Sequence, residues 1–287
     1  MQPVILAIVN NKGGVGKTTL ATNLSHALAN RGHKVLVADL DSQSNTTHFF
    51  LPPEISNYLS LYDLLKDTSR NKPESEIRRY IYPTEYEGVD LLPNVQRSAA
   101  LEPILYQDVE AAYTALRRNL RDYALKHYKF CIIDCPPNIG VWVMMSLLAS
   151  DCVIVPIESG SDRSIDGLDL AIDTINQVSE TVNPDLRFLR LLVNKVDKRK
   201  TSTRNMLTRM AQDYGPENMF NTTLSESDIY KQSESENRTV IRYQPRSSAA
   251  NQIRSLGAEL CSILEQYDLD QSQGKLFNEQ TDVEVSE

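Results

Sequence analysis

The chain has 287 residues, of which 41% are hydrophobic and 24% are charged, and its formal net charge is −8. A chain of this length and composition can bury a core without disulfides or metals. The acidic balance argues against a wholly basic nucleic-acid-binding protein, and four scattered cysteines without a C-x-x-C spacing argue against a zinc or disulfide framework.

Short apolar runs alternate with helix-like segments along the chain, as in a parallel sheet that is buried on both faces. We expect, in chain order, a strand at 4–9, a helix at 17–31, strands at 34–39 and 89–92, a helix at 110–127, a strand at 130–134, a helix at 141–150, a strand at 152–157, a helix at 166–182, a strand at 188–193 and a helix at 248–266. The fold class is therefore α/β, a doubly wound and mostly parallel sheet with helices on both faces.

The expected organisation is one domain over residues 1–267, followed by a polar, acidic and disordered tail over residues 268–287. No stretch approaches 18 apolar residues, and residues 1–10 carry no basic leader. We therefore expect neither a membrane span nor a signal peptide.

The strongest motif is a glycine-rich loop between the first expected strand and the first expected helix, where a phosphate-binding P-loop belongs. Its glycines allow a tight turn whose backbone N–H groups converge on phosphate oxygens, and the helix N-terminus adds positive charge. Lys17 can reach the β- and γ-phosphates, and the Thr18 hydroxyl can ligate Mg²⁺. The expected phosphate-binding residues are Lys12, Gly13, Gly14, Val15, Gly16, Lys17, Thr18 and Thr19.

Three acidic residues follow buried strands: Asp39 and Asp41 after the second, and Asp134 after the fourth. Carboxylates at the carboxyl ends of parallel strands lie beside the phosphate loop, where they can hold Mg²⁺ through its water shell. Asp39 could instead simply cap the segment that follows it.

A weaker motif, Asn-Lys-Val-Asp at residues 194–197, follows the sixth expected strand. Taken literally, it matches the N-K-x-D pattern with which GTPases recognise guanine. Four residues alone are not specific, so ATP and GTP both remain candidates at this point.

Lys12 is the unusual element, because an ordinary P-loop needs no lysine at its start. The run Lys-Gly-Gly-Val-Gly-Lys-Thr-Thr at residues 12–19 resembles the deviant Walker A motif of the ParA/MinD superfamily of P-loop NTPases. In that family the first lysine reaches across a dimer interface to the phosphates of the partner subunit, like an arginine finger supplied in trans. The resemblance favours ATP as the ligand.

The resemblance also implies roles for the remaining residues. It makes Lys12, Lys17 and Asp41 catalytic, with Asp41 orienting the attacking water. It assigns Thr18, Asp39 and Asp134 to Mg²⁺, and Asn194 to the adenine base.

The likeness extends over about residues 4–265 and is closest to the short, single-domain members of the family. It includes the segments 41–45, 89–94, 133–137, 164–168 and 243–247. Residues 225–229 depart from it, because Ser-Glu-Ser-Asp-Ile stands where the family carries Pro-Arg-Asn and a further arginine. Ser42 and Ser44 replace the usual Pro and Gly of the segment that contains Asp41.

Basic residues gather in the C-terminal third of this acidic chain. Residues 187–209 hold eight basic residues and one acid, and residues 238–254 hold four arginines and no acid. Such charge suits contacts with DNA phosphates without base readout, although a solvated basic face is the simpler alternative. The expected DNA-binding residues are Lys198, Arg199, Lys200 and Arg204.

The expected function is a slow, partner-stimulated ATPase that needs ATP and Mg²⁺, dimerises with ATP, and positions plasmid, chromosome or protein cargo on nonspecific DNA. The expected partners are a second copy of the chain, nonspecific DNA and a ParB-like or small adaptor protein, without a membrane, at a cytoplasmic, nucleoid-associated location. One alternative is a MinD-like membrane switch, which needs a basic amphipathic C-terminal helix. The other is a metabolic or GTPase member of the same superfamily.

Overall fold

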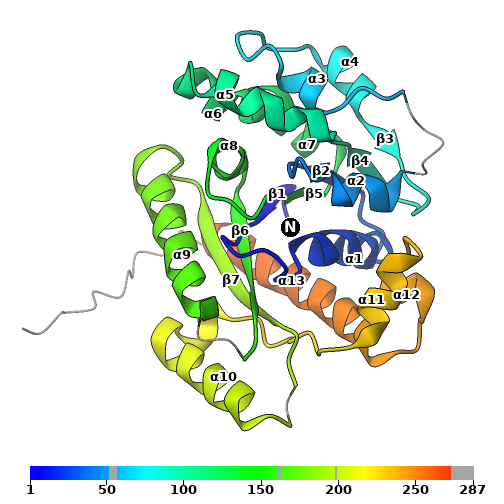
Figure 1. Ribbon diagram of the computed structural model, residues 1–287, viewed down its shortest axis with the longest axis vertical. Coiled ribbons are helices and arrows are strands. Elements are labelled where there is room, and N and C mark those ends of the chain that lie inside the picture. The colour runs from blue at the N-terminus through cyan, green and yellow to red at the C-terminus, as the bar shows by residue number, and fades with distance from the viewer. Residues whose placement is uncertain (52–56, 161–162, 198, 273–287) are drawn as a thin grey trace, which may run out of the picture.

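The computed structural model describes residues 1–51, 57–160, 163–197 and 199–272. Within them, seven strands form one sheet in the order β3-β4-β2-β5-β1-β6-β7 (Figure 1). All neighbouring strands are parallel except β3, which runs antiparallel to β4. The strands are β1 (Val4–Ile8), β2 (Val35–Asp39), β3 (Tyr82–Pro83), β4 (Val89–Leu92), β5 (Phe130–Asp134), β6 (Cys152–Glu158) and β7 (Arg187–Asn194).

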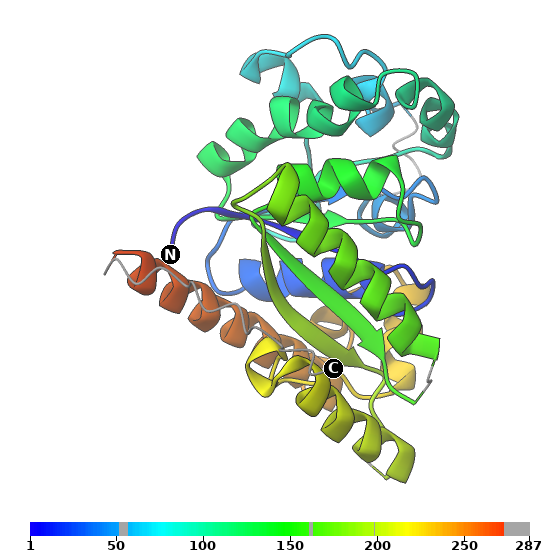
Figure 2. The ribbon, with the colours of Figure 1, turned by 90° about the vertical axis from the view of Figure 1, so that its left-hand side faces the viewer.

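Helices cover both faces of this sheet (Figures 1 and 2). They are α1 (Lys17–Ala29), α2 (Asn45–Phe50), α3 (Leu61–Leu65), α4 (Glu74–Ile77), α5 (Glu102–Leu105), α6 (Val109–Leu116), α7 (Asp122–His127), α8 (Val141–Ala149), α9 (Arg163–Thr181), α10 (Thr201–Tyr214), α11 (Asp228–Ser235), α12 (Val240–Tyr243) and α13 (Ser248–Ser272).

The sheet separates two hydrophobic cores, because alternate residues of a strand point to opposite faces. From β1, Leu6 and Ile8 pack into the core that α1 and α13 cover. Ile5 and Ala7 pack into the other core, with side chains of α6, α8 and α9. Both faces of the central strands are buried, which explains why these strands are apolar apart from the acidic residues at the ends of β2, β5 and β6.

Every strand and helix expected from the sequence is present, with ends that differ by up to six residues. The fold class is confirmed. The expected long helix at 110–127 is interrupted by a π-helical turn at Arg117–Arg121, between α6 and α7. The last helix, α13, runs to Ser272, five residues into the predicted tail, and residues 273–287 lie outside the described residues. The sequence did not predict the short helices and the short strand of two to eight residues, nor did it predict α10.

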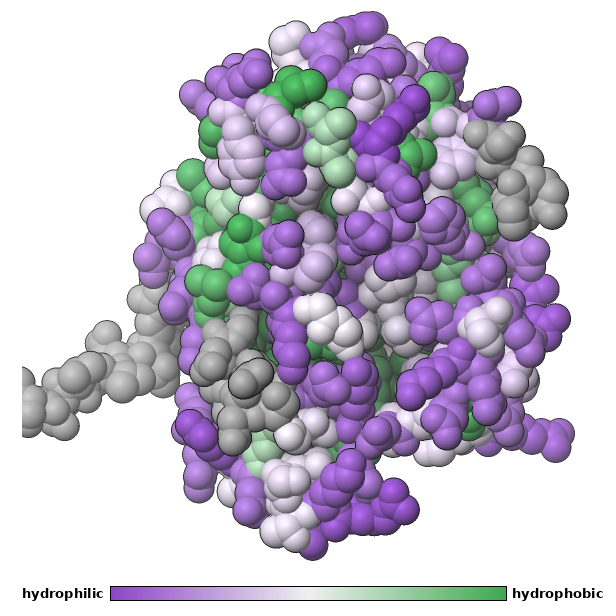
Figure 3. Space-filling view, viewed as in Figure 1, coloured by the Kyte–Doolittle hydropathy of each residue, from purple (hydrophilic) through white to green (hydrophobic). Residues whose placement is uncertain are grey.

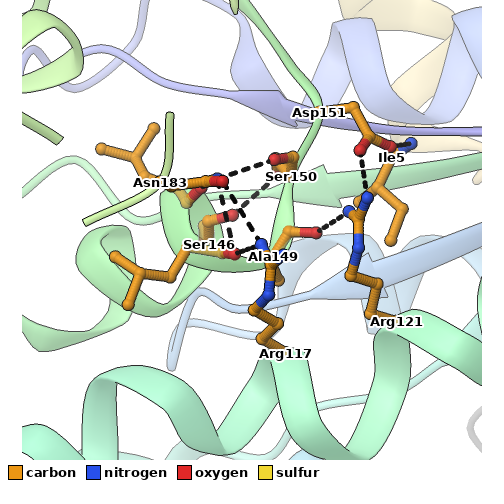
Figure 4. A network of polar contacts seen from close by, with 10 residues as sticks. Ile5, Arg117, Arg121, Ser146, Ala149, Ser150, Asp151 and Asn183 are labelled. Carbon is orange, nitrogen blue, oxygen red and sulfur yellow. Dashed lines mark hydrogen bonds and ion pairs between the residues drawn. The ribbon is translucent and has the colours of Figure 1, made fainter. Parts of the chain in front are cut away.

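The π turn points two arginines at the carboxyl end of α8 (Figure 4). Arg117 donates to the carbonyl of Leu148 at 2.7 Å, and Arg121 donates to that of Ala149 at 2.9 Å. Arg121 also pairs with Asp151 at 2.5 Å, and a second oxygen of Asp151 accepts the backbone N–H of Ile5 at 2.8 Å. The last carbonyls of α8, which have no partner within the helix, are thereby satisfied.

None of the helices in the described part of the chain combines the length and the hydrophobicity that a membrane span requires.

Candidate nucleotide-binding site

A cleft of about 710 Å³ opens at the carboxyl edge of the sheet, where the ends of β1, β2, β5, β6 and β7 converge. This edge faces the viewer in Figure 1 and lies on the right in Figure 2. Figure 3 shows the same face, on which hydrophilic side chains predominate. The lining includes the predicted residues Gly13, Gly14, Gly16, Lys17, Thr18, Thr19, Asp41 and Asn194.

The P-loop has the tight backbone that its glycines predict. Gly14 and Gly16 adopt left-handed φ angles of 75° and 97°. A Cβ on Gly16 would lie 2.4 Å from the Nδ2 of Asn194, so glycine is required there by both conformation and space. Lys17 begins α1 and is buried, with its Nζ donating to the carbonyls of Asn10 and Lys12 at 3.1 Å each.

Asp134 lies at the end of β5 and is shared by two hydroxyl groups. Its Oδ2 accepts hydrogen bonds from the Oγ1 atoms of Thr18 and Thr46, each at 2.7 Å. Its Oδ1 is buried and has no hydrogen-bond partner. Burial raises the pKa of Asp134 to about 6. A buried carboxylate oxygen without a partner, next to the P-loop threonine, fits a hydrated Mg²⁺ ion.

Asp39 lies beside Asp134 in the sheet register and is fully buried. Its Oδ2 accepts the N–H of Thr47 at 2.8 Å and its hydroxyl at 2.7 Å, while its Oδ1 accepts the N–H of Asp41 at 3.1 Å. Burial, followed by the charge of Asp134, raises the pKa of Asp39 to about 8. These contacts give Asp39 the capping role that the sequence left open, and its role towards Mg²⁺ stays a prediction.

Asp41 lines the cleft and begins the turn that leads to α2. Its Oδ1 accepts the N–H of Gln43 at 2.9 Å, and its carbonyl accepts the side-chain amide of Asn94 at 3.1 Å. Ser44 has a left-handed φ of 57°, a conformation that costs a non-glycine residue about 1–2 kcal/mol. The segment is therefore held in a strained turn, with the Asp41 carboxylate at the cleft.

Asn194 connects the end of β7 to the P-loop. Its Nδ2 donates to the carbonyl of Val15 at 2.8 Å, and its Oδ1 accepts the N–H of Lys195 at 2.8 Å. The side chain is buried against Gly16. In this structure its amide shapes the phosphate loop, and the predicted contact with the adenine base stays a prediction.

Lys12 immediately precedes the cleft residue Gly13, and its side chain is 32% exposed. Its Nζ is 3.7 Å from the Oε2 of Glu158, and the Oε1 of the same carboxylate is 3.2 Å from the Nζ of Lys195. Motif analysis missed Glu158 and also missed Thr46 and Thr47. The signal that could have found Glu158 is its place at the end of a strand that borders β1.

The predicted DNA-binding residues are partly neutralised by acids. Arg199 pairs with both oxygens of Asp197 at 2.8 and 2.9 Å and holds the pKa of that carboxyl at about 2. Lys200 lies 3.3 Å from Glu226 and 3.9 Å from Asp197. Arg204 is exposed on α10, and Lys198 lies outside the described residues. Glu226, one of the two acids that depart from the family pattern, therefore contacts the predicted basic surface.

A protein family described as "AAA domain" matches residues 3–188. The sporulation initiation inhibitor protein Soj of Bacillus subtilis is 29% identical over 90% of this chain and 98% of the relative. The chromosome-partitioning ATPase Soj of Thermus thermophilus is 29% identical over 91% of this chain and 96% of the relative.

This chain belongs to the ParA/MinD superfamily. The predicted resemblance is confirmed. A solved structure of cobyrinic acid a,c-diamide synthase from Mycobacterium smegmatis, with bound ADP and magnesium, superposes with a TM-score of 0.75. It is 26% identical to this chain, and the match covers 93% of this chain and 96% of that structure. Proteins with different activities therefore share this fold.

The environment of Gly16 leads to a stability prediction. Gly16→Ala should destabilise the protein by about 1–3 kcal/mol, because alanine is strained at a left-handed φ and its Cβ collides with Asn194. Gly13→Ala is the matched control, since a Cβ there meets nothing within 4 Å. Urea unfolding of the nucleotide-free protein measures both. Equal stability of the two variants would contradict this account of the loop.

The raised pKa values of Asp39 and Asp134 lead to a pH prediction. A carboxyl with a raised pKa binds its proton more tightly in the folded state, so its contribution to stability is lost as pH rises from about 4 towards 8. The nucleotide-free protein should lose more stability between pH 6 and pH 8 than its Asp39→Asn variant. Denaturant unfolding at both pH values measures the difference, and parallel pH profiles would be inconsistent with the shifted pKa of Asp39.

Proposed function

We propose that this protein is an ATPase that uses ATP and Mg²⁺ to switch a homodimer that positions or partitions cargo. The observation that carries this proposal is the contact between the Thr18 hydroxyl and Asp134 at the base of the P-loop, with the second oxygen of Asp134 buried and unpaired. This is the arrangement of a nucleotide-bound Mg²⁺ site. The names of the Soj relative of Thermus thermophilus and of the ADP–magnesium structure support ATP chemistry.

The chain's own residues then have distinct tasks. The P-loop N–H groups bind the phosphates, and Lys17 exchanges the carbonyls of Asn10 and Lys12 for the β- and γ-phosphate oxygens. Thr18 and Asp134 would hold Mg²⁺, which neutralises phosphate charge. Asp41 orients the attacking water from its turn at the rim of the cleft. Lys12 acts on the nucleotide of a second copy, as the family resemblance implies.

We infer that nonspecific DNA is the matrix and that a ParB-like or small adaptor protein stimulates hydrolysis, consistent with a nucleoid-associated location. Two copies of the basic surface in a dimer would bind DNA phosphates more tightly than one copy. Because Lys200 is paired with Glu226, the positive charge of this surface is smaller than the number of its basic residues suggests. The membrane-switched alternative depends on residues 268–287, most of which lie outside the described residues.

Nucleotide binding is the first test. Lys17→Ala should abolish binding of ATP, because the substitution removes the cation that faces the β- and γ-phosphates. Lys66→Ala is the control, on an exposed side chain of the α3 end. Equilibrium titration with fluorescent ATP and GTP analogues measures affinity and base preference. Multi-angle light scattering should show a dimer with ATP and a monomer with ADP. A preference for GTP, or one mass in every nucleotide state, would refute the proposal.

DNA retention is the second test. Replacing Arg199, Lys200 and Arg204 with alanine should remove ATP-dependent retention of nonspecific duplex DNA and spare ATP binding. Glu226→Gln should strengthen retention, because it frees Lys200 from a neighbouring acid. The slope of log affinity against log salt should become less steep by about 0.9 for each DNA phosphate that a variant no longer neutralises. If the ATP-bound wild-type protein retains no DNA at about 50 mM salt, where such interactions are strong, DNA is not the matrix.

A further inference from the structure

Three of the large hydrophobic side chains that are exposed in the described part of the chain lie within six residues of each other. Ile104 is 55% exposed, Tyr106 is 49% exposed and Val109 is 38% exposed. They belong to the end of α5, the turn after it and the start of α6, and we call them the α5–α6 patch. Exposed acids, Asp108 and Glu110, lie next to it in the chain. A cluster of exposed apolar side chains with polar neighbours is typical of an interaction surface, whereas single exposed residues are not.

The local structure keeps the patch outside the core. Leu105, between Ile104 and Tyr106, is buried in the core on the α6 and α8 side of the sheet. The N–H of Tyr106 donates to the carbonyl of Glu102 at 3.1 Å and closes the last turn of α5. Asp108 then caps α6, because its Oδ1 accepts the N–H of Ala111 at 3.0 Å. The patch is therefore held in a defined conformation, with its apolar side chains in contact with solvent.

The patch lies beside a loop of the nucleotide cleft. A Cβ on Gly140 would be 3.4 Å from the Oε1 of Glu102 and 3.4 Å from the hydroxyl oxygen of Tyr106. Gly140 immediately precedes α8, and Pro137 in the same loop lines the cleft. Figure 3 shows hydrophobic side chains at the position that α5 has in Figure 1, on the face that carries the cleft. The patch and the cleft therefore share one face of the protein.

We propose that a second copy of this chain covers the α5–α6 patch when ATP closes the dimer. The proposal depends on the ATP-dependent dimer of the proposed function, in which Lys12 reaches the nucleotide of the second copy. That reach brings the second copy over the cleft, and the patch is on the same face beside a cleft loop. In a two-fold dimer each subunit then buries its own patch.

Tyr106 and Ile104 are the residues of the patch that contribute most to the dimer. Tyrosine is among the side chains that carry most of the binding energy at protein interfaces, and Ile104 is the most exposed member of the patch. Each substitution occurs twice in a two-fold dimer, so its effect on the dissociation constant is the product of two equal losses. A loss of about fivefold for each copy raises the dimer dissociation constant by about 25-fold.

The experiment measures dimerisation by sedimentation velocity with Mg²⁺ and a saturating non-hydrolysable ATP analogue. Tyr106→Ser and Ile104→Ser should each raise the dimer dissociation constant by about 25-fold. Tyr106→Phe keeps the aromatic ring and should leave the dissociation constant nearly unchanged. The affinity of each variant for ADP and its urea unfolding curve are measured alongside and should match those of the wild type.

Val182→Ser is the matched control. Val182 is 56% exposed, and it lies between the end of α9 and the start of β7, at the edge of the sheet opposite the cleft. Its substitution should leave the dimer dissociation constant unchanged. An unchanged constant in both serine variants of the patch overturns the proposal and assigns the patch to a different partner. An equal loss in Val182→Ser, or a loss in Tyr106→Phe as large as in Tyr106→Ser, also overturns it.

A second readout separates this surface from the proposed function. Hydroxyl-radical oxidation of the wild-type chain is quantified by mass spectrometry with ADP and with the ATP analogue. Oxidation of Tyr106 and Ile104 should fall severalfold with the ATP analogue, and oxidation of Val182 should not change. A dimer in which Tyr106 is oxidised as readily as in the monomer overturns the surface and leaves the proposed function standing. A wild-type chain that stays monomeric with the ATP analogue overturns the proposed dimer, and the surface with it.

Discussion

The Asp134 carboxylate is the contact on which the nucleotide site depends. Through one oxygen it binds hydroxyl groups from the start of α1 and the start of α2, so it joins the phosphate loop to the segment that carries Asp41. A ligand that draws the Thr18 hydroxyl away leaves Thr46 alone on that oxygen. Occupancy of the P-loop is thereby coupled to the position of the Asp41 turn through a pair of hydrogen bonds.

Buried charge explains much of the arrangement around this contact. Asp39 and Asp134 are adjacent in the sheet, and the charge of Asp134 adds to burial in raising the cost of ionising Asp39. Thr47, Thr18 and Thr46 supply the hydrogen bonds that offset part of this cost. At the rim, where solvent enters, the same problem is solved with charge pairs, as Glu158 shows with two lysines. The buried carboxylates of the site are thus paired with hydroxyl groups, whereas the carboxylate at the rim is paired with ammonium groups.

The sequence predicts the fold and the phosphate loop well, because each signal is local. The apolar run at β1 and the glycines before Lys17 need no knowledge of distant residues. The remaining features depend on tertiary contacts. The π turn between α6 and α7 forms where two arginines contact the end of α8. The hydrophobic periodicity of residues 110–127 does not predict it.

The charges of the chain show the same limit. Counting basic residues predicts a strongly positive surface at 195–209, but the count cannot show that Glu226, distant in sequence, lies against Lys200. Likewise, Asn194 belongs to a recognisable motif, yet both ends of its amide are used to hold the P-loop and its neighbour. A sequence motif therefore predicts the position of a residue in the fold more reliably than it predicts the hydrogen bonds of that residue.

The anchoring of α8 has a mechanical consequence. Its carboxyl end is fixed by Arg117 and Arg121 at the edge of the sheet farthest from the cleft, while its amino end follows the loop that contains Pro137, a cleft residue. A nine-residue helix is about 13 Å long, so a small tilt about its fixed carboxyl end displaces its amino end. A tilt of roughly 10° about that end moves the other by about 2 Å, which is comparable to the shifts by which packed helices signal between subunits.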